Sequence, residues 1–270
     1  MERRHGIGIK HLELGTEITI AYRTITGDPC LPTLVFLHEG LGCMEMWRRF
    51  AEQLCQLSGC PGMLYDRQGY GQSSPLTARR SLDYMHAYAL KELPAVLSRV
   101  IPRRPYLIVG HSEGGGIGLI HAAQKPTGLR GVITEAAHVF VEELTLRGIG
   151  RTVEAFDAGR LDLLYAYHGD KTAALFRAWA GTWLADWFQS WNLTRLLPEI
   201  QCPLLAVQGL NDQYGSPRQV AAIADGISGP SEKALLAGCG HVPHHEQRKR
   251  VLALMAEFIG RAVPVAGRHD

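Results

Sequence analysis

The stretch that decides the fold is residues 106–118, YLIVGHSEGGGIG. Its first four residues are apolar and indicate a short buried strand, and the small residues at its end predict a helix. Between them, GHSEG at 110–114 has the form G-x-S-x-G. In this position Ser112 must adopt a strained backbone, and its neighbours must be small so that the turn can pass close to other strands. The turn exposes the hydroxyl group to the unpaired N–H groups of a helix N-terminus. The alternative interpretation of this stretch is a glycine-rich junction between a strand and a helix in which the serine has no function.

The bulk composition narrows the class of protein. The chain has 270 residues, of which 46% are apolar and 20% charged, enough for one large α/β domain or two small ones. A formal net charge of +2 argues against nucleic acid as a partner. The six cysteines form no C-x-x-C pair, and no His/Asp/Glu spacing indicates a metal. Without a signal-peptide core or a membrane-length apolar run, we expect a soluble, cytoplasmic protein without membrane contact.

Strand-like and helix-like segments alternate along the chain, which predicts βαβ units and a mostly parallel sheet with helices on both faces. A hairpin is expected at 7–14 and 17–24. The other predicted strands are 33–37, 62–65, 106–109, 131–136, 203–207 and 233–236. The alternation stops at 138–197, where only helical patterns occur. The sequence therefore predicts a core domain formed by 1–137 and 198–270, with a helical cap at 138–197.

A nucleophilic serine needs a base, and the base needs an orienting acid. Asp212 follows the strand at 203–207, and His241 follows the strand at 233–236, each in a loop at the carboxyl edge of the sheet, where ligands of open parallel sheets bind. Glu135, at the end of another strand, is a rival for the acid. His244 and His245 are rivals for the base, and they are expected on the first turn of the last helix.

The sequence resembles the α/β-hydrolase superfamily over essentially its whole length. The motifs that carry the resemblance are HEGLG at 38–42, DRQGYGQS at 66–73, GHSEGG at 110–115, NDQYG at 211–215 and GCGHVPHHE at 238–246. Together they are specific for the fold and for a serine triad, and not for a substrate. The resemblance implies that Ser112 is the nucleophile, His241 the general base and Asp212 the orienting carboxylate. Compact, capped esterases are the most similar type.

The resemblance also implies an oxyanion hole made of two backbone N–H groups. One belongs to Glu113, which follows the nucleophile, and the other to Gly40 or Leu41 in the loop after residues 33–37. Glu39 stands where the superfamily usually has glycine, so the second donor stays open. We expect the Glu39 carboxylate to turn away from the site and to pair with Arg67 or with backbone donors.

The predicted cap contains tryptophans at 179, 183, 187 and 191, a spacing typical of one helix face. Such stripes are mostly core, but a cap over the strand edge should also line an acyl pocket. The residues expected to line the substrate pocket are Leu41, Phe140, Leu144, Trp183, Trp187 and Phe188.

The expected reaction is hydrolysis of a small carboxylic ester, a small-molecule substrate, through an acyl-enzyme intermediate and without cofactor or metal. Hydrolysis of a C–C bond, lactone or thioester by the same triad is one alternative, and a non-catalytic small-molecule receptor is another. Epoxide and haloalkane hydrolysis are disfavoured because they need a carboxylate at position 112. The oligomeric state does not follow from the sequence.

Overall fold

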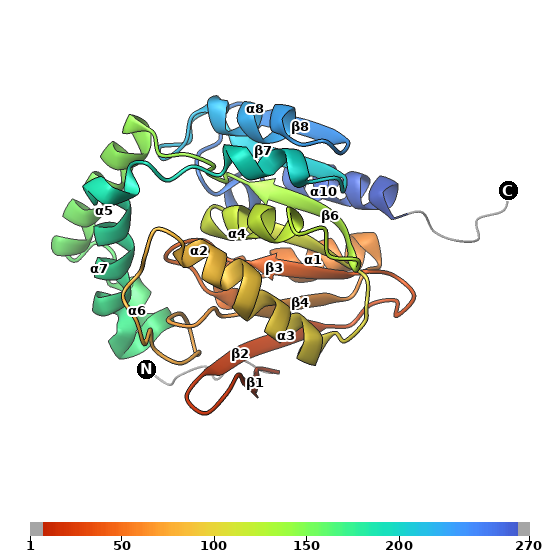
Figure 1. Cartoon of the computed structure of the whole chain (residues 1–270), viewed down its shortest axis with the longest axis horizontal. Helices are drawn as coiled ribbons and strands as arrows, with labels where there is room; N and C mark the ends of the chain where they lie inside the picture. The colour runs from red at the N-terminus through yellow and green to blue at the C-terminus, as the bar shows by residue number, and fades with distance from the viewer. Residues whose placement is uncertain (1–7, 264–270) are drawn as a thin grey trace, which may run out of the picture.

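Within residues 8–263, which the computed structural model describes, eight strands form one sheet in the order β1-β2-β4-β3-β5-β6-β7-β8 (Figure 1). β1 and β2 pair antiparallel, β2 pairs antiparallel with β4, and every other pairing is parallel. The strands are β1 (Lys10–Glu13), β2 (Thr19–Ile25), β3 (Thr33–Leu37), β4 (Gly62–Tyr65), β5 (Tyr106–His111), β6 (Leu129–Glu135), β7 (Leu204–Gly209) and β8 (Ser231–Leu236). Their carboxyl ends, from β3 to β8, share one edge.

Helices cover both faces of the sheet. On one face, α1 and α10 bury an apolar cluster that includes Phe50 and Met255. On the other face, α3, α4 and α8 bury a second cluster that includes Ile117 and Ile223. The helices outside the insert are α1 (Phe50–Ser58), α2 (Tyr84–Ala87), α3 (Leu93–Val100), α4 (Glu113–Ala122), α8 (Pro217–Gly226), α9 (Pro243–Glu246) and α10 (Arg248–Ala262). The predicted α/β class, with a mostly parallel sheet between helices, is confirmed.

Two helical segments of the core are interrupted. The segment 44–57 is divided into a 3₁₀ turn, η1 (Met44–Trp47), and α1, because Arg48 has a φ of +49° and cannot continue a right-handed helix. The segment 81–100 becomes helical at Tyr84 and contains a π turn, η2 (Tyr88–Glu92), before Pro94 in the first turn of α3. The predicted hairpin is formed by β1 and β2, and residue 7 lies outside the described residues.

Residues 138–197 form helices between β6 and β7, and residues 143–183 of this segment lie at one end of the sheet, on the left in Figure 1. The segment includes α5 (Glu143–Asp157), α6 (Leu163–His168), α7 (Thr172–Trp183) and the 3₁₀ turns η3 (Gly169–Lys171), η4 (Asp186–Phe188) and η5 (Thr194–Glu199). We call this segment the insert. It leaves from the carboxyl end of β6, so it lies beside the edge where the predicted site residues are found.

Hydrogen bonds hold the insert to the core. Lys171 Nζ donates to the carbonyl oxygens of Gly71 at 2.7 Å and of Tyr70 at 3.3 Å. His168 Nδ1 accepts from the Gly71 N–H at 2.9 Å, and its Nε2 donates to the Leu41 carbonyl at 2.9 Å. This pattern requires a neutral imidazole, since Nδ1 must be free to accept.

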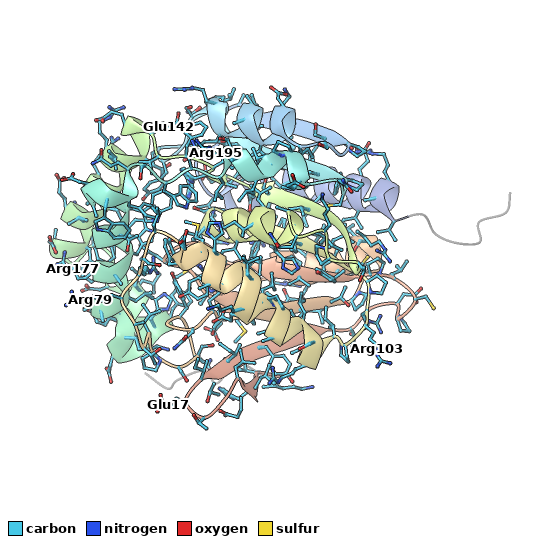
Figure 2. The ribbon with its side chains drawn as sticks, viewed as in Figure 1. Glu17, Arg79, Arg103, Glu142, Arg177 and Arg195 are labelled. Carbon is cyan, nitrogen blue, oxygen red and sulfur yellow. The ribbon has the colours of Figure 1, made fainter. Side chains whose placement is uncertain are left out.

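Charged side chains such as Glu17, Arg103 and Arg177 point outward from the ribbon (Figure 2). In the part of the chain that the structure describes, no helix has the length and apolar character needed to cross a membrane.

Candidate active site

The turn after β5 places Ser112 in a backbone conformation that is rare for a residue with a side chain. Its φ is +51° and its ψ is −115°. The Ser112 N–H donates to the Glu135 carbonyl at 2.8 Å, which anchors the turn to β6. Two residues later, a Cβ at Gly114 would lie 2.1 Å from the Leu37 carbonyl oxygen, so only glycine lets the turn approach β3 this closely. The strain expected from the sequence is therefore present at Ser112 itself.

Ser112, His241 and Asp212 lie in hydrogen-bonding contact. His241 Nε2 is 3.1 Å from Ser112 Oγ. His241 Nδ1 is 2.9 Å from each carboxylate oxygen of Asp212. With Nδ1 donating to the carboxylate, Nε2 is left as an acceptor for the serine proton, which is the tautomer that a general base needs. The structure thus brings the three predicted residues together in the predicted order of contacts.

The loops that carry Asp212 and His241 can lie in contact because Gly209 has no side chain. A Cβ at Gly209 would lie 2.1 Å from the Cys239 carbonyl oxygen. The same carbonyl accepts the Asn211 N–H at 2.8 Å, which joins the loop after β7 to the loop after β8. The two loops are 29 residues apart in sequence at the triad positions, and this contact makes them neighbours in space.

Asp212 is held as a carboxylate. It is 6% exposed and accepts hydrogen bonds from the Tyr214 N–H at 2.8 Å and from Gln208 Nε2 at 3.3 Å. Burial works to raise the pKa of Asp212, but His241 and the backbone donor outweigh it and bring the pKa below its usual range. An ionised Asp212 can therefore stabilise the imidazolium that forms when His241 accepts a proton.

Glu113 and both candidates for the second oxyanion donor, Gly40 and Leu41, line one cavity with Ser112. The volume of this cavity is about 220 Å³. Neither Gly40 nor Leu41 donates its N–H to another backbone group in the described chain. Both are therefore free to donate to a bound oxygen.

The Glu113 side chain is buried away from solvent in a cluster of donors. Arg67 Nη1 lies 3.1 Å from its Oε2, and Arg80 Nη1 lies 3.4 Å from its Oε1. Tyr84 Oη and Trp183 Nε1 donate to Oε1 at 2.7 and 3.1 Å. Burial works to raise the pKa of Glu113, but Arg80 and Arg67 together lower it to about 2. The Glu113 carboxylate is thus ionised, and the two arginines balance its negative charge before any substrate binds.

The position of Glu39 differs from the expectation. Its side chain is 26% exposed, lines the cavity, and does not pair with Arg67; Arg67 binds the backbone carbonyl of Glu39 instead. The nearest cationic group is His111, whose Nδ1 lies 3.4 Å from Oε2. His111 Nε2 also lies 2.8 Å from the His241 carbonyl oxygen. Burial acts to lower the pKa of His111, but the Glu39 carboxylate has the larger, opposite effect and raises the pKa to about 9.

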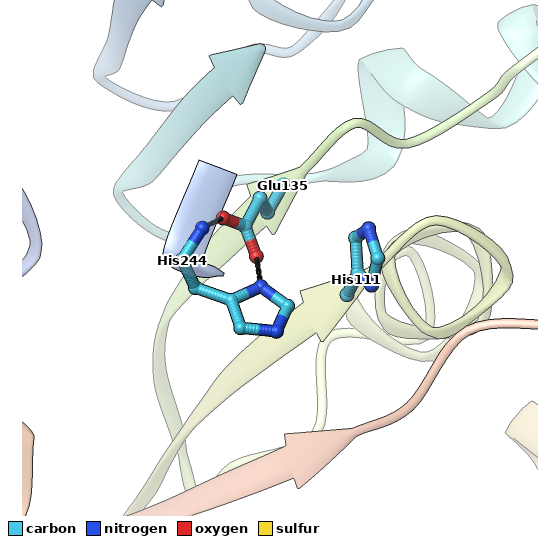
Figure 3. Close-up of side chains that lie close together, drawn as sticks. All are labelled: His111, Glu135 and His244. Carbon is cyan, nitrogen blue, oxygen red and sulfur yellow. Dashed lines mark hydrogen bonds and ion pairs between the residues drawn. The ribbon is translucent and has the colours of Figure 1, made fainter. Parts of the chain in front are cut away.

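Glu135, the rival acid, is engaged by another imidazole (Figure 3). Its two oxygens accept from the backbone N–H and from Nδ1 of His244, each at 2.5 Å. His111, Glu135 and His244 offer possible metal-ligand atoms within 4.8 Å of one another. A metal ion there would have to displace both of the contacts between Glu135 and His244, so the donor set fits an internal hydrogen-bonded pair better than a metal site.

Two of the six residues predicted to line the pocket, Leu41 and Trp183, line the cavity, and the other four do not. The prediction was wrong for Trp187 and Phe188 because α7 ends at Trp183, so the four-residue spacing no longer describes one helix face beyond it. Trp187 is 49% exposed, while Phe188 is fully buried against Trp191 at a ring distance of 5.5 Å.

The prediction was also wrong for Phe140 and Leu144. Phe140 forms an isolated bridge with Asn192 and lies under the guanidinium of Arg218, 5.7 Å from the ring centroid. Leu144 is one position before Thr145, and a helix turns by about 100° per residue, so it lies off the lined face. The α5 residues that line the cavity are Thr145 and Ile149.

Sequence reasoning also missed several lining residues: Ile149, Thr145, His138, Trp179, Gln213, Tyr214 and Val242. Trp179 belonged to the recognised tryptophan row, and Gln213 and Tyr214 follow Asp212 within a recognised motif. For Ile149 and Thr145, the spacing of four residues in an amphipathic segment was the available signal.

Solved structures share the fold of this chain. It is similar to the crystal structure of VinJ, with a TM-score of 0.72, 22% identity and coverage of 95% of this chain and 99% of that one. It is also similar to an esterase from Thermogutta terrifontis, with a TM-score of 0.68, 20% identity and coverage of 95% and 98%.

Curated relatives match over part of the chain. A 2-succinyl-6-hydroxy-2,4-cyclohexadiene-1-carboxylate synthase from Enterobacter sp. (strain 638) is 31% identical over 119 residues, 43% of this chain and 42% of that protein. The enzyme of the same name from Escherichia coli O1:K1 / APEC is 26% identical over 191 residues, 69% of this chain and 65% of that protein. The chain thus matches less than two thirds of the length of these relatives. The profile of the alpha/beta hydrolase family matches residues 34–254, and the chain belongs to that family.

Proposed function

We propose that this protein is a serine hydrolase that cleaves a small carboxylic ester, with the insert, residues 138–197, acting as a cap over the site. The observation that carries the proposal is the unbroken contact from Ser112 Oγ to His241 Nε2, at 3.1 Å, and from His241 Nδ1 to Asp212, at 2.9 Å. This chain of contacts ends in a cavity beside free backbone N–H groups.

The geometry supports a two-step reaction. His241 Nε2 takes the proton from Ser112 Oγ as the oxygen attacks the ester carbonyl, and the N–H groups of Gly40 and Glu113 bind the resulting oxyanion. The intermediate collapses, His241 gives its proton to the leaving alkoxide, and the alcohol departs. Water then loses a proton to His241 and attacks the acyl group. Ser112 regains its proton, and the carboxylic acid leaves.

The cavity lining favours a compact, uncharged acyl group. Leu41, Ile149, Trp179, Trp183 and Val242 supply apolar surface, and the volume is about 220 Å³. No arginine or lysine lines the cavity within the described chain. The absence of these cations argues against a ligand that carries several carboxylates, such as the product in the name of the curated relatives. For this reason we favour ester hydrolysis over that synthase reaction.

The test is turnover of p-nitrophenyl esters from acetate to octanoate by the wild-type protein and by Ser112→Ala. We expect saturable hydrolysis of the shorter esters and a loss on the order of 10⁴-fold or more in Ser112→Ala, with unchanged circular dichroism. An equal rate in both proteins would contradict the proposal. Turnover of a lactone, a thioester or a vinylogous diketone in place of every ester would assign the same triad to another bond, and saturable ligand binding without turnover would indicate a receptor.

A further inference from the structure

Arg67 connects the two segments that supply the oxyanion donors, the loop after β3 and the first turn of α4. Its side chain is fully buried. Nη2 donates to the Glu39 carbonyl oxygen at 2.8 Å and to the His38 carbonyl oxygen at 3.2 Å, while Nη1 lies 3.1 Å from Glu113 Oε2. The guanidinium lies over the ring of Tyr70, 4.4 Å from its centroid. One rigid group thus contacts the loop after β3 and the first residue of α4 at once.

The contact with the Glu39 carbonyl fixes the direction of the Gly40 N–H. These two groups belong to the same peptide unit, which is planar and trans, so they point in opposite directions. The carbonyl is held by Arg67 and also accepts from His38 Nδ1 at 2.8 Å and from the Gly42 N–H at 3.2 Å. With the oxygen held on the Arg67 side, the Gly40 N–H points away from Arg67. Gly40 also lines the cavity that contains Ser112.

The contact with Glu113 acts on the other donor. Glu113 is the first residue of α4, so its backbone N–H has no partner within the helix. Its carboxylate is held by the other arm of the Arg67 guanidinium. A displacement of Arg67 would therefore remove one contact from the peptide that carries the Gly40 N–H and one from the first residue of α4 at the same time.

We propose that Arg67 is a positioning residue that sets both oxyanion donors, Gly40 and Glu113, in register with each other. This inference rests on the proposed function, because it assigns a role within the same reaction. Arginine suits the role because its planar fork stays charged and reaches two acceptors in fixed directions, whereas lysine presents a single point charge. Arg67 does not contact the reacting atoms itself.

Arg80 offers a matched control. Its side chain is 3% exposed and also pairs with Glu113, but its other hydrogen bond goes to Tyr70 Oη and not to residues 38–42. Arg67→Lys and Arg80→Lys therefore remove an equivalent buried contact with Glu113. Only Arg67→Lys also releases the loop that carries Gly40.

The experiment compares kcat and KM for p-nitrophenyl acetate in the two variants, together with inhibition by an alkyl trifluoromethyl ketone, which forms an oxyanion on the serine. We expect Arg67→Lys to lower kcat on the order of 100-fold with KM changed less than about threefold, and to weaken inhibition by a similar factor. Arg80→Lys should change kcat less than about fivefold. Equal losses in both variants would show that only neutralisation of Glu113 matters, and a kcat near wild type in Arg67→Lys would also overturn the inference.

If Arg67→Lys does not fold, Arg67→Met/Glu113→Gln and Arg80→Met/Glu113→Gln each remove one buried arginine together with the Glu113 carboxylate and allow the same comparison. Failure of the proposed function would be distinct, because the wild-type protein itself would then hydrolyse no ester and would not be labelled at Ser112 by a fluorophosphonate. That result would remove the inference as well. Failure of the inference alone would leave the wild-type protein active and labelled.

Discussion

Glu135 binds His244 through two contacts of 2.5 Å, one to its backbone N–H and one to its Nδ1 (Figure 3). Both carboxylate oxygens are therefore engaged on the side of His244, and neither reaches His241. A second carboxylate–imidazole pair thus lies beside the candidate triad without being part of it. We therefore expect an orienting role for Asp212 and a structural role for Glu135.

Substitution of the two acids should have different consequences. Asp212→Asn should lower kcat for an ester on the order of 10⁴-fold, because an amide no longer fixes the His241 tautomer. Glu135→Gln should instead lower the free energy of unfolding by about 1–3 kcal/mol, since a buried partner of His244 is weakened. Steady-state kinetics and urea unfolding measure both effects. The reverse pattern, with activity lost in Glu135→Gln and kept in Asp212→Asn, would make Glu135 the catalytic acid.

Stability should fall at alkaline pH because of His111. Its pKa is about 9 in the folded protein, above the ordinary value of 6.5, so its contribution is complete below pH 6.5 and is lost as the pH rises through 9. The difference of 2.5 units corresponds to about 3 kcal/mol. Urea unfolding at pH 6 and pH 10 measures this loss.

Glu39→Gln tests the cause of that loss. Without the carboxylate 3.4 Å from Nδ1, the His111 pKa should fall toward its ordinary value, and the difference in stability between pH 6 and pH 10 should shrink. Arg23→Gln is a suitable control. It removes a surface ion pair between Glu52 and Arg23, which lies on β2 and is far from His111 in sequence. An undiminished alkaline loss in Glu39→Gln would show that another group titrates.

The sequence was sufficient to predict the sheet, the elbow and the three residues that now lie in contact. Each follows a local rule: buried strands are short apolar runs, and the turns after them need small residues. Ser112 and His241 also lie in glycine-rich motifs whose order along the chain is informative. The pattern of strands alone leaves Asp212 and Glu135 as alternatives, because both lie at the carboxyl end of a buried strand, and the resemblance to the α/β-hydrolase superfamily favours Asp212.

The pocket was less predictable because it depends on where helices end and how they rotate. Trp187 continues the spacing of Trp183, yet the helix stops between them, and nothing in the tryptophan row marks that end. The contact of Glu39 with His111 joins the loop after β3 to the last residue of β5, more than 70 residues apart, and no periodic pattern encodes it. The sequence suggests Arg67 only as a partner for the Glu39 carboxylate, whereas its side chain binds the backbone carbonyl oxygen of Glu39.

Lys171 should hold the insert closed against the core. Its ammonium group donates to the carbonyl oxygens of Tyr70, Gly71 and Ser73. Lys171→Met removes these donors and should lower the free energy of unfolding by about 1–3 kcal/mol. It should also speed tryptic cleavage at Arg160 several-fold, measured by limited proteolysis. Arg147→Met, which removes only an exposed pair with Glu143, should leave the cleavage rate unchanged. Equal cleavage rates in the two variants would contradict this role for Lys171.

Ile149 should limit the length of the acyl group. It is 1% exposed and lines the cavity, so Ile149→Ala makes room beyond the present wall. The ratio of kcat/KM for p-nitrophenyl octanoate to that for the acetate should rise about tenfold or more. Trp187→Ala removes a larger side chain outside the cavity and should leave the ratio unchanged. A rise in Trp187→Ala without one in Ile149→Ala would place the acyl group elsewhere.

The most direct test of Ser112 as the nucleophile is intact-protein mass spectrometry after treatment with a fluorophosphonate, followed by peptide mapping. We predict one adduct per chain, located on Ser112, with no adduct in Ser112→Ala and much slower labelling in His241→Ala. An adduct on another residue, or no adduct on a folded wild-type protein, would contradict the assignment of Ser112 as the nucleophile.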